Sequence, residues 1–179
     1  MAAGPRATAP VPARIAEMAV EELEERHADA LRDLLERCTD YFELVFGHPP
    51  GPAERQSVFI ALPEGKAYDD KFTFVFVFQE RLVGLIDLIR DHPEPGEWWL
   101  GMLLLDPSQR SLGLGSESYC AFERWAAASG ARALNVSVAG INTGALRFWR
   151  RLGFAEVDRR RAVRLGVRVD DLVVLRKEL

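Results

Sequence analysis

The sequence predicts an α/β protein with one central mixed sheet and helices on both faces of that sheet. The first observation is the order of its periodic segments: a strand, helices, three strands in succession, a helix, a strand, a helix and two closing strands. The second is size, because 179 residues that are 48% hydrophobic and 28% charged can bury one full core and are too few for two. We therefore expect a single compact domain.

The chain begins with an Ala- and Pro-rich stretch, MAAGPRATAPVPAR, which has no apolar run of signal-peptide length. We expect residues 1–13 to be a flexible leader and residues 14–179 to form the domain. No apolar run approaches the roughly 18 residues of a membrane span, and Cys38 and Cys120 form no C-x-x-C pair. These features predict a cytoplasmic protein that contacts no membrane.

The first elements follow from periodicity. Residues 14–20, RIAEMAV, alternate imperfectly and predict a strand. Residues 21–38 predict a helix, because their leucines recur at helical spacing and their first turn is acidic. The next segment is punctuated by Gly and Pro and predicts short helices at 41–46 and 53–61, of a kind that often covers an active site.

The middle of the chain predicts three strands. In KFTFVFVFQ, residues 71–79, phenylalanines occupy every second position and so share one face. Such a stripe can line a ligand pocket, but packing in the core is the favoured interpretation. The following strands are residues 81–91 and 97–106, separated by the turn HPEPG.

The last third predicts a helix from Ser116 onward, a strand at 131–139, a short helix at 142–152 and closing strands at 154–165 and 170–179. Seven arginines cluster between 150 and 168, and two interpretations are open: solvated strand and turn positions, which we favour, or a groove for a polyanion. The net charge of −4 opposes nucleic-acid binding by the protein as a whole.

A glycine-rich turn, DPSQRSLGLGS, joins the third middle strand to the next helix. Arg110, Gly113 and Gly115 spell R-x-x-G-x-G, and alternate glycines let several backbone N–H groups converge on an anion at the helix N-terminus. A P-loop is excluded because Gly115 is followed by Ser and Glu, and a dinucleotide fingerprint is excluded because the turn follows a strand meander. A phosphate cradle and a plain strand-to-helix turn both remain open on this motif alone.

A second motif, NTGALRFWRRLGF, comes about 25 residues later. Asn142 predicts an N-cap, an apolar stripe follows at helical spacing, and Gly153 ends the helix. Strand LLLDP, turn QRSLGLG, strand LNVSVA and helix N-x-x-A-x-x-F-W-x-x-L-G-F, in this order over Glu97–Phe154, resemble the GNAT superfamily of acyl-CoA-dependent N-acetyltransferases.

The resemblance implies a GNAT-like fold and a binding site for acetyl-CoA. The strand WWLGMLLL is expected to splay from the strand LNVSV, with Gly101 as the bulge that bends it, and the pantetheine arm is expected to lie in the gap. The turn is expected to hold the diphosphate through its N–H groups. The implied cofactor-binding residues are Leu103, Leu104, Leu105, Arg110, Ser111, Leu112, Gly113, Leu114, Gly115, Ser116, Asn142, Phe148 and Trp149.

Catalysis requires a base for the acceptor amine. Glu97 is the best-placed carboxylate, with Asp91 the second catalytic candidate and Asp87 and His92 as rivals, although each of these is more commonly a solvated strand-end residue. Trp149 occupies the position where the family usually has a tyrosine that acts as the acid. Two alternatives to this acid are open: Tyr119 or Cys120 protonates the departing thiolate, or the thiolate leaves unaided. For the side chains of Tyr119 and Cys120, packing in the core is the favoured interpretation.

An acidic and aromatic rim favours a small cationic amine, such as an aminoglycoside-like molecule, as substrate. The rim residues are Asp40, Tyr41, Phe42, Glu43, Asp91, Glu94, Glu97, Trp98 and Trp99. A protein amine is the alternative acceptor, and a non-catalytic acyl-CoA sensor is the alternative function. We expect no metal and no nucleic-acid partner, and a homodimer is left open.

Overall fold

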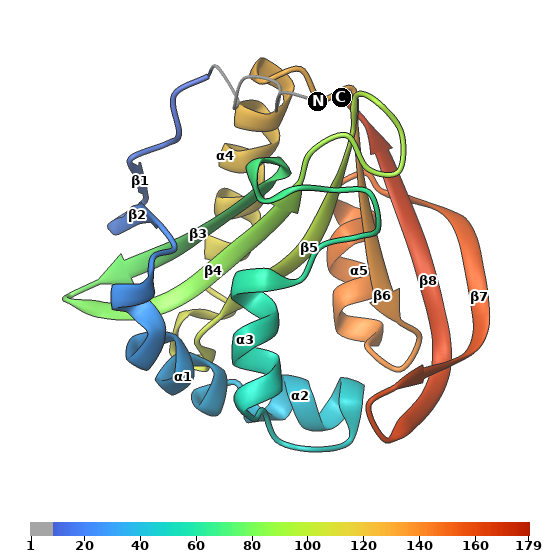
Figure 1. Cartoon of the computed structure of the whole chain (residues 1–179), viewed down its shortest axis with the longest axis horizontal. Coiled ribbons are helices and arrows are strands. Elements are labelled where there is room, and N and C mark those ends of the chain that lie inside the picture. The colour runs from blue at the N-terminus through green and yellow to red at the C-terminus, as the bar shows by residue number, and fades with distance from the viewer. Residues whose placement is uncertain (1–8) are drawn as a thin grey trace.

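Segments of alternating polarity form one eight-stranded sheet in the computed structural model, which describes residues 9–179 (Figure 1). The strand order is β1-β2-β3-β4-β5-β6-β8-β7, antiparallel throughout except for the parallel pair β5–β6. The strands are β1 Arg14–Ile15, β2 Met18–Glu22, β3 Lys71–Phe78, β4 Arg81–Ile89, β5 Glu97–Leu105, β6 Ala133–Ala139, β7 Ala155–Leu165 and β8 Arg168–Glu178. The predicted mixed sheet is confirmed.

Helices cover both faces of this sheet, as predicted (Figure 1). On one face lie α1, α2 and α3, and on the other lie α4 and α5. Their bounds are α1 Ala28–Arg37, α2 Thr39–Phe46, α3 Pro52–Ile60, α4 Leu114–Ala128 and α5 Thr143–Arg151. No helix among residues 9–179 is long and apolar enough to cross a membrane.

The alternation of β3 divides the core into two parts. Phe72, Phe74 and Phe76 pack against aromatic residues of α4, with ring centroids 5.1–6.1 Å apart. Val75 points to the opposite face and packs in the second cluster with leucines of α1. The phenylalanine stripe therefore serves the core, because a large aromatic face is stabilised most when it is removed from water.

Two boundaries near the N-terminus differ from the prediction. Residues 14–20 form two short strands, because a turn with Ala16 at φ +48° folds β2 back on β1. The predicted helix 21–38 begins at Ala28, because Glu21 and Glu22 pair with β3. One turn of 3₁₀ helix intervenes, in which His27 Nδ1 accepts from the Glu24 N–H at 2.9 Å. Ladder hydrogen bonds thus outweigh the helical pattern of the acidic residues.

The proposed leader falls partly outside the described residues, which begin at Ala9. Residues 9–13 contact the domain: the Ala9 carbonyl accepts from Trp125 Nε1 at 3.2 Å, and the Ala13 carbonyl accepts from the Val20 N–H at 3.0 Å. The boundary between leader and domain at residue 13 stays a prediction.

Candidate active site

The strands β5 and β6 separate in the middle of the sheet. They pair from Glu97↔Ala133 to Leu100↔Val136 and then diverge, as the ribbons in Figure 1 show. Opposite β4, Asp87 aligns with Met102 and Leu88 with Leu100, so Gly101 is the extra residue of a bulge. The predicted splay and the predicted bulge at Gly101 are both confirmed. The edge of β5 beyond Gly101 is therefore not paired with β6 within the described part of the chain.

The glycine turn lies at the end of β5. Gly113 is the N-cap of α4 at φ +82°, and a Cβ built there would meet nothing within 4 Å. A Cβ at Gly115 would lie 3.5 Å from the Phe148 ring of α5 and 3.7 Å from Leu105 of β5. The turn thus brings the splayed strand, the N-terminus of α4 and α5 together. The helix begins at Leu114, earlier than the predicted Ser116, because glycine adopts the left-handed N-cap conformation at little cost.

The first turn of α4 offers N–H groups that have no acceptor within the helix. These belong to Leu114, Gly115 and Ser116, and such groups favour an anion at a helix N-terminus. Leu112, in the same turn, is 64% exposed.

Arg110 is engaged by other groups of the chain at the surface. Its guanidinium donates to both carboxylate oxygens of Asp40 on α2, at 2.5 and 3.2 Å, and its Nε donates to the Leu105 carbonyl at 2.9 Å. The hydrogen bonds from Arg110 hold the pKa of Asp40 below its usual range. Arg110 therefore fastens the turn to α2 and β5. The carbonyl of Leu105, one of the expected cofactor-binding residues, already has a partner.

Three of the expected cofactor-binding residues lie on α5 or at its N-cap, and each has different surroundings. Asn142 Oδ1 accepts from the Ala145 N–H at 3.1 Å, which confirms the predicted N-cap. Phe148 is half-buried beside Gly115. Trp149 is only 5% exposed, and its ring packs edge-on against Tyr119, Phe148 and Phe154. Phe148 is thus the aromatic residue of α5 that lies beside the glycine turn, and Trp149 packs against it in the core.

Tyr119 cannot replace the missing acid. Its hydroxyl donates to Glu123, which also accepts from Lys177 Nζ at 2.5 Å. Burial, and then the hydrogen bond to Glu123, raise the pKa of Tyr119 far above its ordinary value. Tyr119 is fully buried in the core, so its proton is unavailable to a cofactor in the gap.

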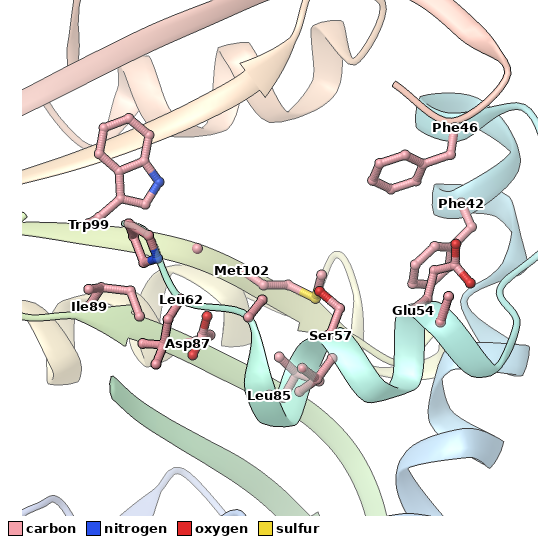
Figure 2. A pocket seen from close by; sticks show the side chains of 15 residues that line it. Phe42, Phe46, Glu54, Ser57, Leu62, Leu85, Asp87, Ile89, Trp99 and Met102 are labelled. Atoms are coloured by element: carbon pink, nitrogen blue, oxygen red, sulfur yellow. The ribbon is translucent and has the colours of Figure 1, made fainter. Parts of the chain in front are cut away.

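A pocket of about 470 Å³ opens on the face covered by α2 and α3. Figure 2 shows Trp99 at one end, Phe42 and Phe46 at the other, and Asp87 and Met102 between them. Helix α3 contributes a wall through Ser57 and its neighbours. The pocket reaches Gly101 and Met102, so it meets the β5–β6 gap at the bulge.

The β7–β8 hairpin holds one end of this pocket. The Val167 N–H donates to the Phe46 carbonyl at 2.9 Å, and the Arg168 guanidinium donates to the Glu43 carbonyl at 3.0 Å. Gly166 at φ +60° is required in this contact, because a Cβ there would lie 2.6 Å from the Phe46 oxygen. The end of α2 that carries Phe46 is therefore fixed by a segment far away in sequence.

Asp87 is the carboxylate of β4 and β5 that lines the pocket. Its Oδ1 accepts from Lys71 Nζ and from Thr73 Oγ1, each at 2.7 Å. Its Oδ2 points at the bulge, where a Cβ on residue 101 would approach it to 2.7 Å. The glycine thus leaves open the space in front of one carboxylate oxygen.

Neither predicted catalytic residue lines this pocket. Glu97 accepts from Arg176 and, at 3.1 Å, from Asn135 Nδ2, and the hydrogen bond from Arg176 is the main cause that lowers its pKa. Asp91 Oδ1 accepts from the Gly96 N–H at 2.7 Å and so closes the turn before β5. The ring of His92 packs against Trp99, and burial lowers its pKa. The catalytic roles of Glu97 and Asp91 stay predictions, and their surroundings favour structural roles.

The predicted rim is assembled only in part. Phe42 and Trp99 line the pocket, whereas Trp98 is buried on the opposite face and Asp40 turns toward Arg110. Phe46 and the residues of α3 were not predicted individually as part of the site. The Gly- and Pro-rich segment that carries them was, however, predicted to cover an active site.

Several members of the arginine cluster contact acidic side chains of the β7–β8 hairpin. Arg159 and Arg150 contact Glu156 at 2.9 and 3.1 Å, and Arg161 contacts Asp171 at 3.3 Å. This pairing supports the interpretation of solvated strand positions over a polyanion groove. Among residues 9–179, no group of three or more His, Cys, Asp or Glu side chains is arranged to hold a metal ion.

A mixed sheet that splays beside a glycine turn, with a pocket that reaches the splay, is the arrangement expected of an acyl-CoA-dependent transferase. The family model described as "Acetyltransferase (GNAT) family" matches residues 28–154. The chain therefore belongs to the GNAT acetyltransferase family and is an acetyl-CoA-dependent N-acetyltransferase. A search of curated proteins found no match.

Solved structures share the fold. An acetyltransferase from Thermus thermophilus superposes with a TM-score of 0.71 at 22% identity, covering 92% of this chain and 99% of that one. The Salmonella typhimurium acetyl transferase that modifies the N-terminal serine of ribosomal protein L7/L12 gives 0.75 at 15% identity, with 94% and 98% covered. The Escherichia coli ribosomal-protein-S18-alanine N-acetyltransferase gives 0.67 at 17% identity, with 90% and 93% covered. At these identities the likeness concerns the fold alone.

Proposed function

We propose that the protein transfers the acetyl group of acetyl-CoA to the primary amine of a small molecule bound in the pocket between α2, α3, β4 and β5. The observation that carries this proposal is that the pocket and the β5–β6 gap meet at Gly101 and Met102. A thioester held in the gap and an amine held in the pocket thus approach each other at the bulge.

The residues around the gap fit the cofactor. Bound acetyl-CoA supplies the activated acetyl group as a thioester. The N–H groups of Leu114, Gly115 and Ser116 would hold the diphosphate, and the open space at Gly113 lets an anion approach the backbone closely. Phe148 would pack against the pantetheine arm, while Arg110 keeps the turn in place through its bonds to Asp40 and Leu105.

Asp87 is the proposed proton acceptor. An alkylamine has a pKa near 10.4, so its deprotonation at neutral pH costs about 4 to 5 kcal/mol and is helped by a base. Lys71 and Thr73 hold Oδ1, which leaves Oδ2 to accept an N–H of the amine at the bulge. The proton moves to Oδ2 directly or through a water molecule, and the neutral nitrogen faces the thioester carbon.

The departing thiolate needs no acid from this chain. Trp149 is an indole without a titrating proton, and Tyr119 donates to Glu123 in the core. As the amine nitrogen bonds to the acetyl carbon, the C–S bond breaks and the nitrogen gives up a second proton to solvent. A thiol with a pKa of about 8.5 is already a tolerable leaving group, so solvent can protonate the sulfur after departure.

The test combines binding with turnover. Acetyl-CoA should raise the melting temperature, and a panel of primary amines should release free thiol. Asp87→Asn should lower kcat by roughly 10²- to 10⁴-fold with unchanged acetyl-CoA affinity. Asp91→Asn is the matched comparison, because its carboxylate caps a turn outside the pocket. A large loss in that variant with a near-normal Asp87→Asn would transfer the role to Asp91.

Two alternatives are decided by the same panel. Binding of acetyl-CoA without turnover of any amine would support a non-catalytic sensor, a role for which the tryptophan at 149 is the main argument. The Salmonella protein modifies the N-terminal serine of ribosomal protein L7/L12, and the Escherichia coli protein is a ribosomal-protein-S18-alanine N-acetyltransferase. Peptides with free N-terminal Ser or Ala therefore belong in the panel, and a preference for them would support a protein amine as acceptor.

A further inference from the structure

The walls of the acceptor pocket are almost entirely apolar. Aromatic rings close both ends, with Trp99 at one and Phe42 and Phe46 at the other (Figure 2). Phe42 and Phe46 stack with ring centroids 6.0 Å apart at an angle of 26°. Aliphatic side chains such as Met102 lie between these ends. A pocket of this composition recognises a ligand by burying its apolar surface.

Among residues 9–179, three polar side chains line the pocket, and two of them already have hydrogen-bond partners in the protein. Glu54 Oε2 accepts from the Gly51 N–H at 2.8 Å and so caps α3, while its Oε1 faces His48 at 3.8 Å. The other two polar side chains are Ser57 and Asp87. Asp87 Oδ1 accepts hydrogen bonds from Lys71 and Thr73. Asp87 Oδ2 is the carboxylate oxygen that lies at the bulge, where the proposed amine meets the thioester.

No arginine or lysine lines the pocket within the described part of the chain. Lys71 is not among the lining residues; its side chain is only 5% exposed, and its ammonium is bonded to Asp87. A ligand carboxylate or phosphate would therefore enter without a cationic partner and would face Asp87 and Glu54. Burial of an unpaired charge is strongly unfavourable.

Resting on the proposed function, we infer that the acceptor is a primary amine on an aromatic or branched apolar body, and that it carries no carboxylate and few hydroxyl groups. The amine lies at Asp87 Oδ2 beside Gly101, and the apolar body extends toward Phe42 and Phe46. An amino sugar would bury several hydroxyl groups against apolar walls, and each buried hydroxyl without a partner weakens binding. This chemistry departs from the aminoglycoside-like acceptor that the acidic rim predicted.

Three matched amines test the inference. 2-Phenylethylamine carries the amine and the ring, ethylamine lacks the ring, and phenylalanine adds a carboxylate to the same body. We expect kcat/KM for 2-phenylethylamine to exceed that for ethylamine by about 30- to 100-fold, as burial of a phenyl group in an apolar pocket allows. We expect phenylalanine to be at least about 100-fold poorer than 2-phenylethylamine. Glucosamine serves as the hydroxylated amine and should also be poor.

Variants of α2 locate the effect. Phe46→Ala should raise KM for 2-phenylethylamine about tenfold and leave the affinity for acetyl-CoA unchanged, and Phe46→Leu should restore part of the loss. Leu44→Ala is the control, because Leu44 lies on the same helix, is 38% exposed and lines no part of the pocket. Equal effects of Phe46→Ala and Leu44→Ala on KM would overturn the placement of the apolar body.

The outcomes separate the two proposals. Thiol release with glucosamine, phenylalanine or a peptide, but not with 2-phenylethylamine, would overturn the acceptor class and leave the transferase intact. If no amine supports thiol release, the proposed function fails, and the acceptor class is judged by binding of 2-phenylethylamine to the protein–CoA complex. Saturable binding that Phe46→Ala weakens would support an amine with an apolar body as the ligand of the pocket, and absence of binding would overturn it.

Discussion

Gly113 and Gly130 form a matched pair at the two ends of α4. Both have positive φ, +82° and +100°, and a Cβ at either would meet nothing within 4 Å. Replacement by alanine forces an L-residue into the left-handed region at each site, which costs about 1 to 2 kcal/mol. For a chain of this length that corresponds to a loss of roughly 2 to 8 °C in melting temperature. The two variants should therefore be destabilised alike.

Only the Gly113 variant should also lose cofactor affinity. Its Cβ occupies the space in front of the first N–H groups of α4, where the diphosphate is proposed to lie, whereas Gly130 follows the opposite end of that helix. Acetyl-CoA at 100 times its Kd stabilises the wild type by about 2.7 kcal/mol, and a tenfold weaker Kd reduces this to about 1.4 kcal/mol.

Thermal shift at several acetyl-CoA concentrations, supported by calorimetric titration, measures both quantities. The unliganded melting temperatures give the backbone strain, and the concentration dependence gives Kd. If Gly113→Ala and Gly130→Ala bind acetyl-CoA as tightly as the wild type, the assignment of the turn as the diphosphate site is refuted. A weakened Gly130→Ala with a normal Gly113→Ala would refute it equally.

Three further predictions concern single side chains. Hydrogen bonds from Ser108 and Arg37 outweigh burial and lower the pKa of Asp106 to about 2. Because this folded-state pKa is below the unfolded value, the ionised carboxylate contributes about 2 kcal/mol to the free energy of unfolding above pH 4. That contribution is lost as the pH falls from 4 to 2. Asp106→Asn should accordingly destabilise the protein at pH 7, with a difference in urea midpoint that shrinks in acid. Gly101→Ala, whose Cβ would lie 2.7 Å from Asp87 Oδ2, should lower kcat at least about tenfold without weakening acetyl-CoA binding; a normal kcat would contradict the role of the bulge. Trp149→Phe should destabilise by about 1 to 3 kcal/mol through lost packing and leave the pH profile of kcat unaltered; a lost ionisation would show an acid role.

Much of the fold could be predicted because it depends on local pattern. The alternation of β3 decides which face each phenylalanine occupies, and Asn142 caps α5 whatever surrounds it. The bulge at Gly101 was implied by the family resemblance, and glycine suits it because it tolerates the close approach of Asp87. The face of each phenylalanine and the cap of α5, by contrast, depend only on a residue and its immediate neighbours.

The strand boundary at the N-terminus could not be predicted in this way. Glu21 and Glu22 read as the acidic first turn of a helix, yet they pair with Val75 and Phe74 of β3, more than fifty residues later in the chain. The competing hydrogen bonds come from a strand whose position no local pattern reveals, and they decide the conformation.

The candidate carboxylates show the same division. The motifs that resemble the GNAT family, and with them the expected bulge at Gly101 and the acidic candidates along β4 and β5, follow from the sequence. The partners of each carboxylate, on which its availability depends, follow from the packing of the strands. Arg176 and Asn135 reach Glu97 from β8 and β6, whereas Lys71 and Thr73 on β3 engage only one oxygen of Asp87 and leave the other facing the bulge. Electrostatic partners act across space rather than along the chain, so their choice is made by the packing of strands and not by their spacing.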